Sequence, residues 1–226
     1  MEHLGENVRA GKFGFLLTRE KYAIPNSRSS FYSSQFDVGE AEEWQGTYTD
    51  ESRRFYTEEW CVRQRARALA NFDLNMRYFE QLGGAHFGQA VNQLLSISPR
   101  LRFVDDLKAL DGVEGVYLMI LDDYKQIYVG QADDMRKRIK QHWSGAKQFD
   151  RLLFGPVEVS ILSIDSFRAL DTTRVIAAKT RATSALEQKV EEAVPASFRL
   201  NRLSGGRLDW MEETGRVPYG FGRRLQ

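Results

Sequence analysis

The feature that most constrains the fold is a pair of apolar runs that meet at a short polar turn. Residues 115–121 (GVYLMIL) are typical of a buried strand, and residues 126–130 (QIYVG) are typical of a second strand. The four residues between them, 122–125 (DDYK), supply turn chemistry. The two runs therefore predict a β-hairpin in the C-terminal half of the chain.

The segments around this hairpin predict a small α+β domain. Residues 134–143 (DMRKRIKQHW) indicate a basic helix that Asp133 or Asp134 caps, and residues 157–164 (VEVSILSI) are typical of a third strand. Residues 183–194 indicate another helix, with a capping-box-like start and Pro195 after its end. The order β-β-α-β-α predicts a three-stranded antiparallel sheet flanked by helices. Residues 166–182 form an insert with four basic residues, either an added helix or a loop that contacts nucleic acid.

The N-terminal region is predicted to be mainly helical. A helical pattern begins near Glu58 and stops at Gly83-Gly84, and shorter helices are expected at 87–96 and 104–110. Residues 11–18 could form a short strand, whereas the Ser-rich run that follows reads as a loop. The chain thus divides into a helical region of unknown role (1–110), the α+β domain (111–205) and a basic tail rich in Arg, Gly and aromatic residues (206–226).

The overall charge argues against a strongly basic nucleic-acid binder, but the local distribution does not. The 226 residues include 32 Lys and Arg against 31 Asp and Glu, which gives a formal net charge of +1. Acids gather in residues 37–59, whereas bases outnumber acids in 131–151 and in 195–226. We therefore expect an acidic N-terminal part that lies off the DNA path and a basic face in the C-terminal half.

Cysteine content and hydropathy narrow the class of protein. A lone cysteine, Cys61, can form neither an internal disulfide nor a structural zinc site, and a packed thiol is the expected state. The longest apolar run is too short to span a bilayer, and the first residues lack the pattern of a signal peptide. We expect a cytoplasmic protein that has no membrane partner.

One ordered set of residues carries the chemistry. The hairpin reads Gly-Val-Tyr, ten residues, then Tyr-Val-Gly; an arginine follows eight residues later, and a histidine one helical turn after that. A glutamate in the next helix and an asparagine beyond it complete the order. The set is Gly115, Tyr117, Tyr128, Gly130, Arg138, His142, Glu187 and Asn201. It resembles the signature of the GIY-YIG nuclease family over about residues 112–205.

The resemblance implies a metal-dependent DNA endonuclease with a single metal ion, Mg²⁺ or Mn²⁺, held by Glu187. Arg138 would clamp the phosphate, and His142 would relay a proton or donate to the phosphate. A tyrosine would deprotonate the attacking water if nearby cations lower its pKa; Tyr117 is favoured, with Tyr128 orienting. Glu191 and Glu192 are alternatives to Glu187 that the small-apolar-Glu pattern disfavours.

Further residues are assigned by the same resemblance and by charge. The glycines Gly115 and Gly130 are expected to be architectural, and Asn201 either belongs to the site or holds a loop together. Where some relatives have a lysine after the second glycine, this chain has Gln131. Basic residues that flank the site are expected to contact the DNA backbone. These are Arg136, Lys140, Lys147, Arg202 and Arg207.

Partners and biological role follow less directly. DNA is the expected partner, and double-strand cleavage by one active site requires a homodimer or two successive events. The N-terminal region could set specificity, mediate dimerisation or bind a protein partner such as an inhibitor. A stand-alone nuclease of this kind fits defence, such as restriction, or a mobile element. The alternative is a non-catalytic module that binds nucleic acid or protein on the same fold.

Overall fold

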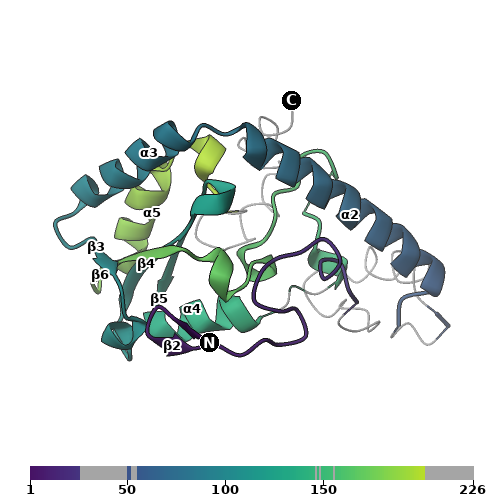
Figure 1. Cartoon of the computed structure of the whole chain (residues 1–226), viewed down its shortest axis with the longest axis horizontal. Coiled ribbons are helices and arrows are strands. Elements are labelled where there is room, and N and C mark those ends of the chain that lie inside the picture. Colours follow the sequence, from purple (N-terminus) through teal and green to yellow (C-terminus); the bar gives the residue numbers. More distant parts are fainter. Residues whose placement is uncertain (26–49, 52–54, 146, 148, 155, 202–226) are drawn as a thin grey trace.

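The centre of the computed structural model is an antiparallel sheet (Figure 1). The structure describes residues 1–25, 50–51, 55–145, 147, 149–154 and 156–201. In this part of the chain the sheet has four strands in the order β3-β6-β4-β5, and all neighbours run antiparallel. The strands are β3 (Arg102–Val104), β4 (Gly115–Leu121), β5 (Gln126–Ala132) and β6 (Arg174–Lys179). The hairpin predicted from the sequence is the β4–β5 pair.

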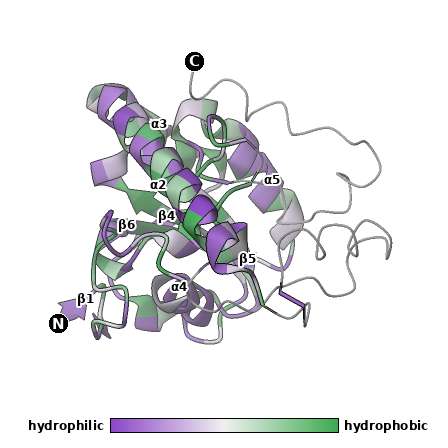
Figure 2. Cartoon of the chain, turned by 90° about the vertical axis from the view of Figure 1, so that its right-hand side faces the viewer, coloured by the Kyte–Doolittle hydropathy of each residue, from purple (hydrophilic) through white to green (hydrophobic). Residues whose placement is uncertain are grey.

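Strand β4 is the most buried element because both faces of the sheet are covered. Every residue of β4 is buried, and its side chains alternate between two apolar clusters. Val116, Leu118 and Ile120 enter one cluster, while Tyr117 and Met119 enter the other. Figure 2 shows β4 in the green of hydrophobic residues and α4 largely in the purple of hydrophilic residues. An unbroken apolar run is what a central strand buried on two sides requires.

Helices cover the two faces. α3 (Gly84–Ile97) and α5 (Thr183–Ala193) pack on one face, and α4 (Met135–Ser144) packs on the other (Figure 1). The long helix α2 (Glu58–Gln81) joins the α4-side cluster through Phe72 and Phe79. A small hairpin of β1 (Glu2–His3) and β2 (Glu6–Asn7) lies beside α4. The α+β class predicted from the sequence is therefore confirmed.

The third strand predicted at residues 157–164 is wrong, and β6 takes its place in the sheet. Residues 160–164 are buried, which explains their apolar pattern, but their backbone is irregular. Two asparagines of α2 occupy the carbonyls instead: Asn71 Nδ2 donates to Val157 at 2.6 Å and to Ser160 at 2.7 Å, and Asn75 Nδ2 donates to Ser160 at 2.9 Å. Strand β6 lies within residues 166–182, the segment interpreted as an insert. Its two alanines and its charged first and last residues give it a weak strand pattern in the sequence.

Several smaller predictions also differ from the structure. Residues 104–110, expected as a helix, contain the end of β3 and a 3₁₀ turn at Leu107–Leu110. No strand forms at residues 11–18, which carry only an isolated bridge at Gly11↔Gly14. Helix α5 begins at the expected position, but no side chain caps it, so the expected capping box is absent. Asp134 does cap α4, because its side chain accepts from the Lys137 amide at 2.9 Å.

Part of the predicted N-terminal region contributes to the central sheet. β3 pairs with β6, and α3 packs through Phe87, Val91 and Leu94 in the same cluster as β4 and α5. The helices α2 and α3 and the strand β3 are therefore built around the same core as the hairpin. None of the described helices is both long enough and apolar enough to cross a membrane.

Candidate active site

The hairpin register brings the two tyrosines together. Tyr117 lies opposite Gly130, and Tyr128 lies opposite Met119, so both side chains point to the α4 face of the sheet. Their rings are diagonal neighbours with centroids 6.3 Å apart. The Tyr117 side chain is fully buried. A pattern of one tyrosine on each strand therefore produces a pair of phenols at one place.

The two glycines have steric reasons to be glycine. A Cβ on Gly130 would lie 2.6 Å from Tyr117 Oη and 3.0 Å from Tyr128 Cε1, so Gly130 makes the space that the Tyr117 ring fills. A Cβ on Gly115 would lie 2.2 Å from the Ala178 carbonyl oxygen, so Gly115 permits the close approach of β4 to β6. Both observations support the architectural roles predicted from the sequence.

Helix α4 places the His142 side chain against Tyr117. His142 is buried, with 2% of its surface exposed, and its Nε2 lies 2.9 Å from Tyr117 Oη. Its ring also meets the Tyr128 ring edge-on, with centroids 5.1 Å apart. Arg138, one turn earlier, is exposed, and its Nη1 donates to Gln141 Oε1 at 3.4 Å. The i, i+4 spacing thus places a guanidinium and an imidazole on the same face of α4.

Asp165 is a polar contact of the site that sequence analysis missed. Its Oδ1 lies 2.7 Å from His142 Nδ1, so His142 is held at both ring nitrogens. Asp165 belongs to a 3₁₀ turn, Ile164–Ser166, in which Ser163 Oγ accepts from the Asp165 amide. No motif marks this residue in the sequence, because its approach to His142 depends on the irregular path of residues 157–164.

The environment of the tyrosines differs from the expected one. Burial raises the pKa of Tyr117 well above its ordinary value, Tyr128 raises it further, and Arg138 lowers it by less. Burial also raises the pKa of Tyr128 to about 12, although Arg138 opposes this. The expectation that Arg138 brings a phenol into the neutral range is therefore not met in the protein alone. Both phenols therefore keep their protons near neutral pH, and His142 Nε2 lies within hydrogen-bond distance of the Tyr117 hydroxyl.

Glu187 approaches the same place from the helix on the opposite face. The first turn of α5 lies beside β5, where Ser184 Oγ contacts Gln131 Oε1 at 3.4 Å. Glu187 is buried, and its charge is a minor cause, after burial, that raises the pKa of both tyrosines. Burial, followed by the charge of Glu191, raises the pKa of Glu187 to about 7. Glu191 is likewise buried one turn later.

The chemistry of Glu187 fits a divalent cation. A buried carboxylate is costly as an anion unless a positive charge meets it, and no described residue donates a hydrogen bond to this one. Mg²⁺ is commonly held by one or two carboxylates together with waters and substrate phosphate oxygens. Among the described residues there is no group of three or more His, Cys, Asp and Glu side chains that could hold an ion by themselves. Within the part of the chain that the structure describes, Glu187 would be the residue that holds the ion.

Asn201 acts on the backbone of the hairpin. Its Oδ1 accepts from the Val129 amide at 3.0 Å, and its Nδ2 donates to the Val129 carbonyl at 2.8 Å. The amide side chain therefore extends the sheet by one residue at the edge of β5, between Tyr128 and Gly130. This geometry matches the loop-holding alternative, in which Asn201 positions the strand that carries Tyr128.

Arg136 and Lys140 lie on the helix face turned away from Arg138 and His142. Arg136 Nε contacts Glu6 Oε1 at 2.6 Å, Lys140 Nζ contacts Glu6 Oε2 at 2.8 Å, and Arg136 also pairs with Asp111 at 2.9 Å. Both side chains thus form ion pairs with the N-terminal hairpin, in which Glu6 is buried. Lys147 lies near Asp165, whose pKa its charge lowers. Arg202, Arg207 and residues 26–49 lie outside the described residues.

The Glu6 ion pairs predict a pH-dependent contribution to stability. The hydrogen bond from Arg136 is the main cause that lowers the pKa of Glu6 to about 2. Since a depressed pKa stabilises the fold above the unfolded-state value, Glu6→Gln should lower the free energy of unfolding at pH 7 by about 1–2 kcal/mol. The gap to wild type should narrow as pH falls from 5 toward 2.5, as measured by urea unfolding at several pH values. The exposed Glu2→Gln is the control, and a gap that stays constant with pH would contradict the assignment.

The candidate site lies at one end of the hairpin and combines phenols, an imidazole, a guanidinium and a carboxylate. This set of groups is suited to phosphodiester hydrolysis. Residues 113–169 match the family model described as the GIY-YIG catalytic domain, so the resemblance predicted from the sequence is confirmed for this segment. Members of this family are in general endonucleases that act on DNA and typically use divalent metals. The match contains Tyr117, Arg138 and His142, whereas Glu187 and Asn201 lie beyond it. Comparisons with curated proteins and with solved structures found no match.

Proposed function

We propose that this protein is a DNA endonuclease that hydrolyses phosphodiester bonds at the site formed by Tyr117, Arg138, His142 and Glu187. The observation that carries the proposal is the buried contact of Tyr117 Oη with His142 Nε2 at 2.9 Å, beside an exposed arginine. A binding surface alone does not need a buried phenol linked to an imidazole. In a hydrolase such a pair can take the proton that the attacking water must lose.

In the proposed reaction Tyr117 Oη takes a proton from the attacking water and gives its own proton to His142 Nε2. The water oxygen forms a bond to phosphorus, and the bond from phosphorus to the leaving oxygen breaks with its electron pair on that oxygen. Arg138 offsets the charge that grows on the phosphoryl oxygens. Tyr128 orients Tyr117 through ring contact. When bound at Glu187, a single Mg²⁺ or Mn²⁺ would polarise the phosphate and stabilise the leaving oxygen.

The proposal extends to organisation and role. Residues 111–205 carry the nuclease site, with β3 and α3 completing their sheet and core. The rest of residues 1–110 carries specificity or partner recognition, and the basic tail 206–226 contacts the DNA backbone. One site cuts one strand, so a homodimer or two successive events would give double-strand breaks. We place the protein in the cytoplasm, in defence such as restriction or in a mobile element, with Lys147 as an additional backbone contact.

Plasmid cleavage tests the proposal directly. With Mg²⁺ or Mn²⁺ the wild type should nick or linearise supercoiled DNA, and chelation should stop the reaction. Arg138→Ala and Glu187→Ala should each reduce cleavage at least about a hundred-fold, because each removes a group that stabilises transition-state charge. Arg77→Ala is a matched control, since Arg77 is an exposed arginine of α2.

A panel of substrates distinguishes the alternatives. Absence of cleavage on plasmid, genomic and branched DNA with either metal would contradict the proposal. A gel shift without cleavage that Glu187→Ala leaves unchanged would instead favour the non-catalytic binding module. Thermal unfolding of each variant shows whether a lost activity reflects the site or the fold.

A further inference from the structure

The His142–Asp165 contact has a consequence for which atom of His142 can accept a proton. Burial alone would raise the pKa of Asp165, but the hydrogen bond from His142 and the charges of His142, Lys147 and Arg138 outweigh it and hold the pKa below its usual value. Asp165 is therefore ionised near neutral pH, and an ionised carboxylate only accepts hydrogen bonds. His142 Nδ1 must then carry the proton that Asp165 Oδ1 accepts.

Neutral His142 is therefore the tautomer with its proton on Nδ1, which leaves Nε2 able to accept a proton. If Nδ1 is protonated in the neutral ring, Nε2 has a free lone pair, and Tyr117 Oη must be the donor across the 2.9 Å contact. The opposite tautomer would point an N–H at Tyr117 and block the transfer of its proton. A carboxylate on the far nitrogen thus selects the productive direction of the hydrogen bond.

A buried arginine holds Asp165 in place. Arg168 joins the end of α4 to the loop that carries Asp165, because Arg168 Nη1 donates to the Gly145 carbonyl at 2.6 Å and Nη2 donates to the Asp165 carbonyl. Nε donates in addition to the Ser166 carbonyl at 3.2 Å. The guanidinium is 5% exposed and lies over the Phe13 ring, 5.2 Å from its centroid. The positions of His142 and Asp165, which belong to separate segments, are therefore fixed relative to each other.

We propose that Asp165 is a positioning residue of the nuclease, anchored by Arg168, which keeps His142 Nε2 unprotonated and ready to receive the Tyr117 proton. The inference rests on the proposed function. In the reaction the water proton moves to Tyr117 Oη and the Tyr117 proton moves to Nε2. The imidazole becomes a cation beside Asp165, which remains ionised and stabilises it.

Charged and titratable groups from several elements surround the hydrogen bonds that join Asp165, His142 and Tyr117. Arg138 comes from α4 itself, Tyr117 and Tyr128 come from the strands, and Asp165 and Lys147 come from the segments beyond α4. Glu187 acts on the tyrosines from α5. Among the described residues only Asp165 forms a hydrogen bond with Nδ1, so its carboxylate can be tested by a substitution that preserves shape.

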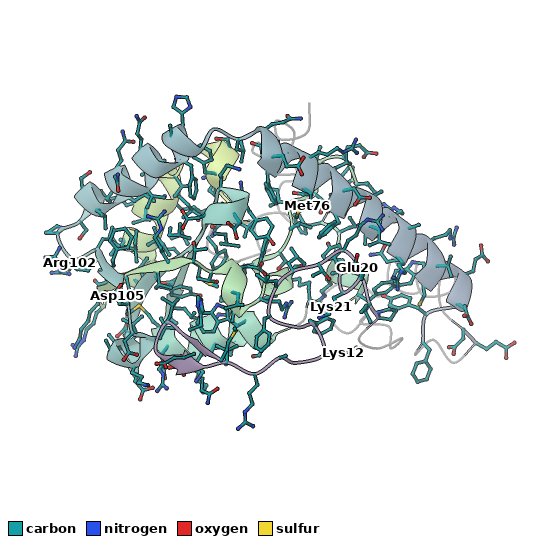
Figure 3. The ribbon with its side chains drawn as sticks, viewed as in Figure 1. Lys12, Glu20, Lys21, Met76, Arg102 and Asp105 are labelled. Carbon is teal, nitrogen blue, oxygen red and sulfur yellow. The ribbon has the colours of Figure 1, made fainter. Side chains whose placement is uncertain are left out.

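The tautomer can be measured without any activity. The chain has three histidines, so ¹⁵N-histidine labelling with His3→Gln and His86→Gln variants assigns the ring nitrogens of His142. The wild type should show Nδ1 protonated and Nε2 unprotonated, and Asp165→Asn should shift this population toward the Nε2–H form. Asp105→Asn is the matched control: Asp105 is exposed just after β3, near Arg102 (Figure 3). An unchanged tautomer in Asp165→Asn would overturn the inference.

Cleavage kinetics separate this inference from the function on which it rests. Asp165→Asn should slow single-turnover cleavage at least about a hundred-fold and move the acid limb of the rate–pH profile to lower pH, because the cationic imidazole loses its counter-charge. A merely structural role would lower the rate at every pH without moving the limb. If wild type cuts, Arg138→Ala does not, and Asp165→Asn cuts with an unmoved limb, the proposed function stands and this inference fails. If the wild type does not cut DNA, the proposed function fails, and the role of Asp165 in proton transfer fails with it.

Discussion

Tyr117→Phe is expected to cleave DNA about a hundred to ten-thousand-fold more slowly than the wild type while it binds DNA with unchanged affinity. The substitution removes one hydroxyl and keeps the buried ring, so packing in the α4-side cluster is preserved. The lost hydroxyl is the atom between the attacking water and His142 Nε2, and a positioned acid–base group contributes rate factors of this size. Single-turnover cleavage with protein in excess, together with a gel shift, measures the two effects separately.

Two further tyrosine variants make the result specific. Tyr124 is another partly buried phenol, and its hydroxyl donates to Asp171 at 2.9 Å, away from His142. Tyr124→Phe should therefore cost about 1 kcal/mol of stability and leave the cleavage rate intact. Tyr128→Phe should slow cleavage less than Tyr117→Phe, because Tyr128 meets His142 through its ring. If Tyr128→Phe proves the slower enzyme, the general base is Tyr128 and the proposed order of the tyrosines is reversed.

The parts of the site that the sequence predicted are those fixed by local geometry. A turn of polar residues sets the hairpin register, and that register alone places Tyr117 opposite Gly130 and beside Tyr128. In the same way, the helical period places Arg138 and His142 on one face of α4. Local spacing and structure agree here because no other segment is needed to bring these groups together.

The parts that the sequence could not supply depend on contacts between distant segments. Residues 157–164 alternate like a strand, but α2 binds their carbonyls through Asn71 and Asn75, so the segment turns and delivers Asp165 to His142. The true strand β6 has a weaker local preference and forms because β3 and β4 flank it. The raised pKa of Tyr117 likewise comes from burial, which a pattern of residue types does not reveal.

Gly115→Ala should lower the free energy of unfolding by at least about 1–3 kcal/mol. We expect this to be the largest effect of adding a single methyl group in the hairpin. Its Cβ would lie 2.2 Å from the Ala178 carbonyl oxygen and 2.9 Å from Met135 Cε. Because the first obstacle is backbone in the neighbouring strand, β4 and β6 must separate where Val116 pairs with Ala178. The free energy of urea unfolding and the thermal midpoint should both fall. An unchanged midpoint would contradict the role of Gly115 as a spacer between strands.

The same substitution at Gly130 should give a different result, because the obstacle there is the Tyr117 side chain. A Cβ 2.6 Å from Tyr117 Oη displaces the phenol rather than a strand, so Gly130→Ala should lose more cleavage activity than stability. Gly88 supplies the matched control: it lies in α3 with open space where a methyl group would project, and Gly88→Ala should stabilise the protein by up to about 1 kcal/mol. If Gly115 and Gly130 responded alike, the division between a strand spacer and a tyrosine pocket would be wrong. A difference in the predicted direction would show that Gly130 makes room for the proton-accepting phenol of Tyr117. It would also show that Gly115 allows the close packing of the strands that carry this phenol.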